Sequence, residues 1–277
     1  MAMVDGIIAT LSSKGNFTKL YYEGKVIYTP KHTPPSNYFH SWASIGRVST
    51  IVGKRIFYLT LDNKVVSLSM DKAAIDRGAL IEVVHHQMDR LAHFWADNKN
   101  VVCLDDLGHV DIVGYVGSHR KVISSVDLSS HLFTEERCFD EARTETTTIT
   151  GCSKYLVVIL YADSDKSHTV CLLDRRGRYQ SKATNSANAY YIGGPNTIHS
   201  VEFSAFKKRL YLVAQHLFSF VSLYVINPLR KAKIFYIGTI VTKINDVKWH
   251  LIPVSSNPDQ FISAAIEPFH MLQIKLN

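Results

Sequence analysis

The sequence predicts an all-β protein built from similar four-stranded units. Its apolar residues fall in many short runs of Val, Ile, Leu, Phe and Tyr, and these runs recur in groups along the chain. Clusters of Gly, Asp, Asn and Lys separate the runs, which is typical of short strands joined by tight turns. Helical patterning is confined to a turn or two within residues 70–84, so helices are expected to be almost absent.

The strand-like runs repeat at a regular interval. The clearest repeat begins at Ile198 and again at Ile244, 46 residues later. In the first copy, apolar residues stand at Ile198, Val201 and Phe203; the second copy has the same spacing, and both are followed by further strand-like runs. Three weaker copies lie between residues 43 and 185. Four strands per unit at about 40–50 residues is the period of propeller blades.

Acidic residues follow the second strand of several units, at Asp62, at Asp105 or Asp106, and at Asp163 or Asp165. In this respect residues 43–277 resemble the WD40 family, whose second strand ends in a tight turn that carries Asp. The chain departs from the family pattern because it has no Trp-Asp dipeptide and no Gly-His pair before the first strand of a unit. The resemblance therefore implies a divergent WD40-like β-propeller, without assigning the family's His–Asp–Trp hydrogen-bond network.

The number of strands predicts how the ring closes. Five units follow residue 43, the first forty residues hold three further strand-like runs, and the last unit ends after its third strand at Leu276. Because a propeller must close its ring, we expect Ile7–Leu11 to complete the last unit beside residues 271–276. The prediction is a single propeller domain over residues 1–277 with six four-stranded blades, or seven if the segment between Lys121 and Thr144 holds another.

The predicted core consists of apolar residues at repeated strand positions. These are Val102, Leu104, Ile112, Val157, Ile159, Val201, Phe203, Leu212, Val225, Val247, Trp249 and Ile262.

The four cysteines show neither the close pairs of a zinc knuckle nor those of a redox motif. Cys103 and Cys171 stand inside apolar runs and are predicted to be reduced core residues, which favours the cytoplasm or the nucleus. The N-terminus lacks the basic region and long apolar stretch of a signal peptide. The longest apolar run, Tyr155–Ala162, is too short to cross a bilayer, so no transmembrane segment is expected.

The search for catalytic motifs is negative. The chain has no G-x-G-x-x-G, P-loop, G-x-S-x-G or H-E-x-x-H motif. His85 and His86 alternate on a strand and cannot easily share a metal, and the Asp163–Asp165 segment lacks the Gly and Glu of a calcium loop. We therefore predict no catalytic residues, no metal and no cofactor. Six-bladed propellers include calcium-dependent hydrolases, which leaves an enzyme as a minor alternative.

The chain carries 31 Lys and Arg against 24 Asp and Glu, a net charge of +7. In a four-stranded meander the first and third turns lie at one end of the strands and the second turn lies at the other. This rule separates the charges, with basic residues at one end and the acids Asp62, Asp105, Asp106, Asp163 and Asp165 at the other. The predicted partner-binding surface comprises the three richest basic turns: Arg175, Arg176, Arg178, Lys207, Lys208, Arg209, Arg230, Lys231 and Lys233.

Two functions are compatible with this surface, besides ordinary solvation of polar turns. The first is a non-catalytic scaffold that binds other protein subunits of a larger assembly through acidic surfaces. The alternative is a binder of RNA or of an anionic, phosphoinositide-containing membrane. Arg175-Arg176-Gly177 resembles the Arg-Arg-Gly motif of phosphoinositide-binding propellers, although its flanking residues differ. Tyr179 and Phe206 are the aromatic residues near these turns, a small platform for stacking RNA bases.

Overall fold

The fold is described from a computed structural model. It describes residues 2–11, 17–30, 49–60, 62–78, 80–105, 107–116, 119–129, 148–162, 167–185, 198–206, 209–216, 220–227, 231–241, 249–253, 260–265 and 270–275. Contacts divide the chain into two compact units, one of residues 1–127 and 147–149 and one of residues 128–146 and 150–277.

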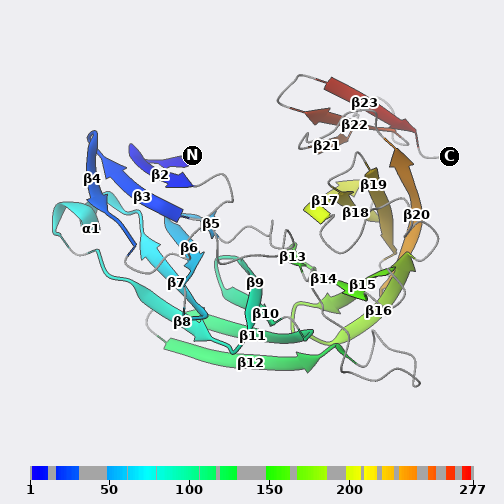
Figure 1. Ribbon diagram of the computed structural model, residues 1–277, viewed down its shortest axis with the longest axis horizontal. Helices are drawn as coiled ribbons and strands as arrows, with labels where there is room; N and C mark the ends of the chain where they lie inside the picture. The colour runs from blue at the N-terminus through cyan, green and yellow to red at the C-terminus, as the bar shows by residue number, and fades with distance from the viewer. Residues whose placement is uncertain are drawn as a thin grey trace. The chain divides into compact units, whose positions relative to one another are not determined.

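The first unit contains three four-stranded sheets whose strands follow one another in chain order (Figure 1). A short helix, α1 (Lys72–Asp76), lies between β7 and β8, within the segment predicted to contain helical turns. The strands are β1 (Ala2–Val4), β2 (Ile7–Leu11), β3 (Phe17–Tyr22), β4 (Lys25–Tyr28), β5 (Ser49–Val52), β6 (Arg55–Leu59), β7 (Lys64–Ser69), β8 (Val83–Gln87), β9 (Leu91–Ala96), β10 (Asn100–Asp105), β11 (His109–Val116) and β12 (His119–Asp127).

The second unit continues the same pattern. Two more four-stranded sheets follow, and then a sheet in which three strands are described. The strands are β13 (Thr148–Gly151), which spans the boundary between the units, β14 (Tyr155–Ala162), β15 (Ser167–Asp174), β16 (Tyr179–Asn185), β17 (Ile198–Phe206), β18 (Arg209–His216), β19 (Phe220–Asn227), β20 (Lys233–Val241), β21 (Trp249–Pro253), β22 (Gln260–Ala265) and β23 (His270–Lys275). The predicted all-β architecture of four-stranded units is thus confirmed.

Tight turns with positive φ join the strands of the first sheet. Asp5 and Gly6 have φ values of 49° and 77°, and Glu23 and Gly24 have 50° and 74°. Two successive residues with positive φ form the two-residue hairpin turn that matches the twist of antiparallel strands. The Asp5-Gly6 turn joins β2 to β1, a three-residue strand that the sequence pattern does not predict.

The prediction that Ile7–Leu11 completes the last sheet is wrong. β2 pairs with β1 through Ile7–Val4 and with β3 through Ile7–Tyr22, so both of its edges are occupied within the first sheet. β23 pairs with β22 in the last sheet. The choice between six and seven blades stays a prediction, because residues 130–147 lie outside the described ranges.

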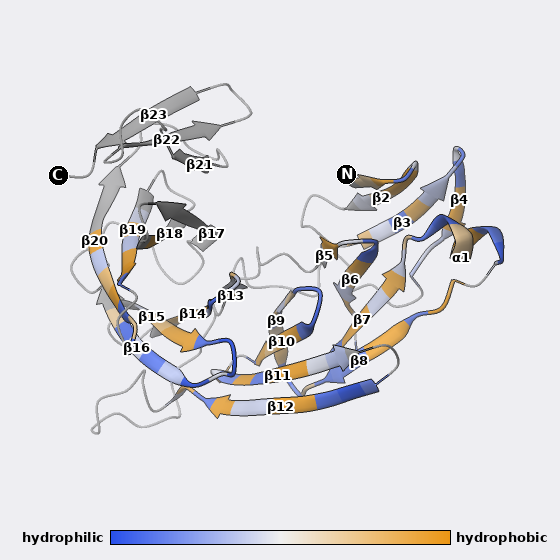
Figure 2. Cartoon of the chain, turned by 180° about the vertical axis from the view of Figure 1, so that it is seen from behind, coloured by the Kyte–Doolittle hydropathy of each residue, from blue (hydrophilic) through white to orange (hydrophobic). Residues whose placement is uncertain are grey.

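Both faces of the central strands β6, β7 and β10 are largely buried, as expected where sheets pack face to face (Figure 2, where β10 carries hydrophobic colour). Phe57 and Val101 belong to one core cluster of the first unit, and Ile7 and Phe17 belong to another. In the second unit a cluster that includes Leu172 and Tyr224 joins two neighbouring sheets. Cys103 and Cys171 are buried free thiols, as predicted, and their burial raises the pKa of each thiol.

The predicted core is largely confirmed wherever its side chains are described. Buried members are Val102, Leu104, Ile112, Val157, Ile159 and Leu212. Val225 is partly exposed, because it alternates on β19 with the buried Tyr224 and Ile226. The side chains of Val201, Phe203, Val247, Trp249 and Ile262 lie outside the described part of the structure.

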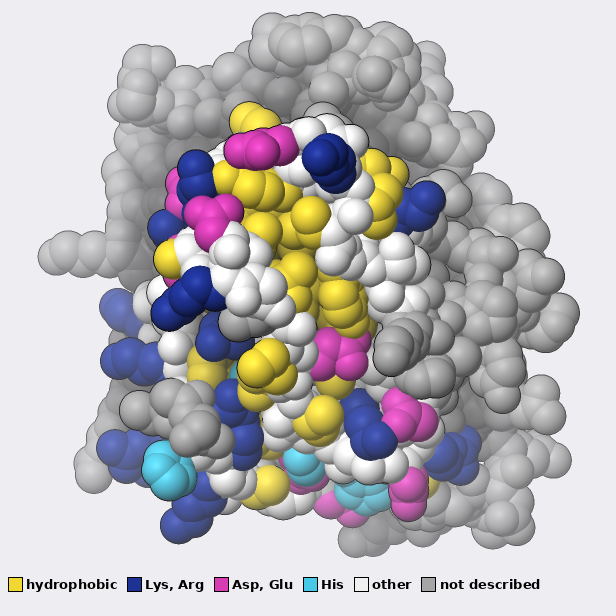
Figure 3. Space-filling view, turned by 90° about the vertical axis from the view of Figure 1, so that its left-hand side faces the viewer, with side chains coloured by type: hydrophobic (Ala, Val, Ile, Leu, Met, Phe, Trp, Pro, Cys, Tyr) yellow, Lys and Arg dark blue, Asp and Glu magenta, His cyan; other side chains and the backbone are white. Residues whose placement is uncertain are grey.

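Many side chains are exposed on β4, β8, β12 and β20, each the last strand of its sheet. On β4, β8, β12 and β20 large apolar side chains face solvent, including Val26, Val84, Ile123 and Phe235. Figure 3 shows apolar side chains gathered in a band on the face that carries part of the first unit, flanked by Lys and Arg. Among the described residues, no helix has the length and apolar character that a transmembrane span requires.

Candidate functional site: a basic pocket between two sheets

Most described residues of the predicted basic surface occupy two turns of the second unit. Arg175, Arg176 and Arg178 lie in the turn between β15 and β16, Lys231 lies just before β20, and Lys233 begins β20. Arg209 begins β18, at the same end of its sheet as Lys233. Lys207, Lys208 and Arg230 lie outside the described residues.

The two turns come together because β16 and β20 contact each other across neighbouring sheets. The backbone N–H of Ile234 donates a hydrogen bond of 3.0 Å to Ser181 Oγ, which joins these strands directly. At their ends lies a pocket of about 470 Å³. It is lined by Tyr155, Asp174, Arg178, Tyr179, Gln180, Lys231 and Ala232.

Asp174 organises the first turn. Its Oδ1 accepts hydrogen bonds of 2.9 Å from the backbone N–H groups of Arg176 and Arg178, and its Oδ2 accepts one of 2.6 Å from Arg178 Nε. Burial of Asp174 opposes its ionisation, but the hydrogen bonds from Arg178 and Arg176 outweigh burial and lower the pKa of this carboxyl. The ionised carboxylate therefore holds the Arg178 guanidinium at the pocket.

Tyrosines form the less polar walls of the pocket. Burial raises the pKa of both Tyr155 and Tyr179, with smaller contributions from Cys152 and Cys171 respectively, so both phenols stay neutral at pH 7. Lys231 Nζ lies 5.9 Å from the centre of the Tyr179 ring, within the range of a cation–π interaction. The pocket thus combines two cations, one carboxylate and two phenols.

Sequence reasoning found only part of this set. It identified Arg178 and Lys231 from their basic turns, but it placed Arg175, Arg176 and Lys233 in the same surface, and these three do not line the pocket. It missed Tyr155, Asp174 and Gln180. The spacing of Asp174 and Arg178 across a Gly-containing turn is the one local signal that could have indicated their ion pair.

The two ends of the sheets are not uniform in sign, although Asp62 and Asp105 lie at turns after a second strand and Arg175, Arg176 and Arg178 lie at a turn after a third strand, as predicted. Acids also lie at the basic end: Lys54 Nζ is 2.7 Å from Asp5 Oδ2 and 3.9 Å from Asp71 Oδ1. A lysine lies at the acidic end, where Lys64 pairs with Asp62. Local ion pairs neutralise single turns, which strand order alone does not reveal. Asp106, Asp163 and Asp165 lie outside the described residues.

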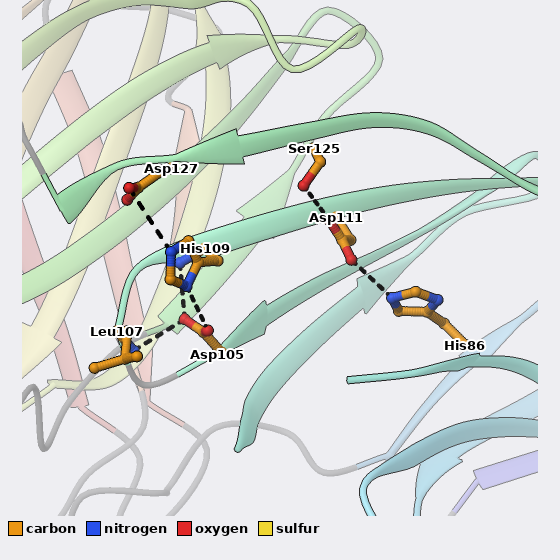
Figure 4. A network of polar contacts seen from close by, with 7 residues as sticks. All are labelled: His86, Asp105, Leu107, His109, Asp111, Ser125 and Asp127. Carbon is orange, nitrogen blue, oxygen red and sulfur yellow. Dashed lines mark hydrogen bonds and ion pairs between the residues drawn. The ribbon is translucent and has the colours of Figure 1, made fainter. Parts of the chain in front are cut away.

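A second polar cluster lies in the first unit (Figure 4). The turn acid Asp105 is buried and accepts hydrogen bonds from the backbone of Leu107 and His109, and its Oδ2 lies 2.7 Å from His109 Nδ1. The hydrogen bond with Asp105 raises the pKa of His109. His109 Nε2 lies 3.7 Å from Asp127. The Asp105 carboxylate thus accepts the hydrogen bonds of its own turn and is not available to a partner protein.

The neighbouring part of this cluster links two sheets. His86 Nε2 on β8 lies 2.9 Å from Asp111 Oδ2 on β11, and Ser125 Oγ donates a hydrogen bond of 2.6 Å to Asp111 Oδ1. In a serine hydrolase the histidine lies between serine and aspartate and accepts the serine proton. Here the aspartate is central, so the cluster does not activate Ser125. Among the residues that the structure describes, no three His, Cys, Asp or Glu side chains are placed to hold a metal ion.

Comparison with known proteins identifies the fold. No family model matches the chain, and no curated protein matches it. Over its whole length the chain is similar to the N-terminal domain of Nup159, with 10% identity, a TM-score of 0.58 and coverage of 75% of that chain.

Two further solved structures share 10% identity with the chain. The hydrazine synthase of Kuenenia stuttgartiensis has a TM-score of 0.45, with coverage of 82% of this chain and 64% of that one. The β-propeller domain of Myceliophteria thermophila Cps50 (Swd1) has a TM-score of 0.43, with coverage of 83% and 68%. The chain is a divergent β-propeller.

Proposed function

We propose that the protein is a non-catalytic propeller scaffold, a single domain over residues 1–277 that binds other protein subunits of a larger assembly in the cytoplasm or nucleus. Its docking surface is the basic set Arg175, Arg176, Arg178, Lys207, Lys208, Arg209, Arg230, Lys231 and Lys233. An acidic surface of a partner protein is the complementary ligand, because clustered cations steer and orient an oppositely charged surface.

One observation carries the proposal: cations from two neighbouring sheets, Arg178 and Lys231, line one pocket. The exposed Arg176 and Lys233 extend this basic area beside it. The polar cluster around Asp111 contains no activated nucleophile, which supports a binding role over a catalytic one. The contact between β16 and β20 holds these two turns together, which suits them to docking.

Charge reversal tests the proposal. The tagged chain is purified from its own cells after nuclease treatment, and proteins recovered at fixed stoichiometry are quantified. We expect Arg176→Glu, Lys231→Glu and Lys233→Glu together to abolish their recovery without lowering the Tm. A matched control, Lys19→Glu, Lys25→Glu and Arg77→Glu, changes the net charge equally at exposed positions of the first unit and is expected to leave recovery intact.

Unchanged recovery after reversal of the basic surface would refute the proposed docking surface. Recovery that depends on added RNA, or binding to phosphoinositide vesicles that is lost in the reversal variant, would favour the alternative. Steep weakening with salt is expected for nucleic acid, since each neutralised phosphate releases a counterion.

A further inference from the structure

We propose that the pocket between the two turns binds a carboxylate, supplied by a Glu or Asp side chain of the partner protein, and that Arg178 and Lys231 are its anchors. This inference rests on the proposed scaffold function and names the partner chemistry that its docking surface selects. It concerns the pocket and not the basic surface as a whole, so the two can be separated by experiment.

The charge of the pocket matches a single carboxylate. Arg178 and Lys231 contribute two positive charges and Asp174 contributes one negative charge, which leaves +1. One carboxylate carries one negative charge and neutralises this lining, whereas a phosphate monoester, with about −1.5 to −2 at pH 7, would leave excess negative charge beside Asp174. A single carboxylate is therefore the anion whose charge this lining balances.

The geometry of Arg178 also suits an incoming carboxylate. Asp174 engages the guanidinium through Nε at 2.6 Å, and among the described residues no partner is found for the two terminal nitrogens. A guanidinium can bind a second carboxylate through its remaining N–H groups. Because Asp174 already fixes the orientation of Arg178, less side-chain freedom is lost when the partner binds.

The aromatic walls disfavour single-stranded RNA. A nucleic-acid base would need an open ring face on which to stack. Lys231 lies over the ring of Tyr179, and Tyr155 is partly buried at the start of β14. These phenols are therefore better suited to contact the aliphatic part of an acidic side chain, while Lys231 forms an ion pair with its carboxylate.

The test uses fluorescence anisotropy with a labelled tetraglutamate peptide. A tetraglutamine peptide, a peptide with two phosphoserines and a ten-nucleotide oligouridylate serve as comparison probes. We expect the tetraglutamate peptide to bind and Lys231→Gln and Arg178→Lys each to weaken it about three- to fivefold, the upper range for partly exposed ion pairs. Lys154→Gln, an exposed cation of the second unit that belongs neither to the basic docking surface nor to the pocket lining, should change the Kd by less than about 1.5-fold.

Equal effects of Lys231→Gln and Lys154→Gln would overturn the pocket assignment, and the basic docking surface would still be tested by charge reversal. Tighter binding of the phosphoserine peptide or of oligouridylate, with the same dependence on Arg178 and Lys231, would overturn the choice of a carboxylate. Absence of tetraglutamate binding would also overturn the inference, whereas the proposed scaffold function is decided separately by recovery of its partner after charge reversal.

Discussion

His85 shows how one buried residue makes the stability of this protein depend on pH. Its ring contacts those of Phe57 and Tyr115, at centroid distances of 5.0 and 4.9 Å, and its Nε2 shares a hydrogen bond of 2.7 Å with Ser67 Oγ. Burial, assisted by the positive charges of Arg120 and Arg55, lowers the pKa of His85 to about 4. The folded protein therefore holds a neutral imidazole at neutral pH.

We predict that acidification destabilises the fold through His85. In the unfolded chain histidine has a pKa of about 6.5, so between pH 6.5 and 4 the unfolded state binds a proton that the folded state does not. The stabilisation is fully present above pH 6.5 and is lost as the pH falls towards 4, by at most about 3 kcal/mol. Urea unfolding at pH 7.5 and pH 5 measures this loss.

His85→Gln should reduce the difference in unfolding free energy between the two pH values, whatever its effect on stability at pH 7.5. The exposed His119 provides the control, because His119→Gln is expected to retain the difference seen in the unmodified protein. An unchanged pH dependence in His85→Gln would show that other groups cause it.

At the level of single elements, the aspartate in the turn after the second strand differs in burial and hydrogen bonding between neighbouring sheets. In the third sheet Asp105 is buried and accepts two backbone hydrogen bonds, of 2.9 Å from Leu107 and 2.7 Å from His109. In the second sheet Asp62 occupies the corresponding turn, but its side chain is 52% exposed and pairs with Lys64 and Thr60. In the third sheet the aspartate therefore holds its turn through backbone hydrogen bonds, whereas in the second sheet it is half exposed and pairs with side chains.

We expect Asp105→Ala to lower the free energy of unfolding by roughly 2 kcal/mol, because it leaves two partly buried backbone donors and His109 without their acceptor. The matched change Asp62→Ala should cost less than about 1 kcal/mol, since exposed ion pairs contribute little. Chemical denaturation of both variants measures the contrast. Equal losses would mean that burial does not distinguish the two turns.

At the scale of the whole molecule, the N-terminal strands are part of the core of the first unit. Ile7 and Ala9 of β2 are buried in one cluster with Tyr58 and Leu68 of the second sheet. β1 is a short outer strand that pairs only with β2 among the described strands. The two strands should therefore differ in importance, although they are neighbours in sequence.

We predict that deletion of residues 1–11 prevents stable folding, because it removes the buried Ile7 and Ala9 and bares the edge of β3. Deletion of residues 1–5 removes β1 and the first turn residue, and it should lower the Tm by only a few degrees. Thermal unfolding and size-exclusion chromatography distinguish the two outcomes. A shorter variant lacking residues 1–11 that melts like the full chain would contradict the place of β2 in this core.

Residue patterns alone predict the all-β class, the four-stranded repeat, the strands of the second to fifth sheets, and the burial of Cys103 and Cys171. These features are encoded locally: the alternation of apolar residues along a strand and the turn residues between strands can be read over a few positions. For the same reason the basic turns that contain Arg178 and Lys231 could be predicted before their surroundings were known.

Strand pairing and contacts between side chains follow from the folded backbone. β2 pairs with β1 and β3 and not with β23, because β1 occupies the edge that β23 would need. β1 has three residues, which is too short for the sequence pattern to predict. The pocket joins Tyr155, Arg178 and Lys231, which are far apart in sequence and belong to two different sheets. Pairing and contacts between sheets depend on distances that the folded backbone sets, and local periodicity carries no information about them.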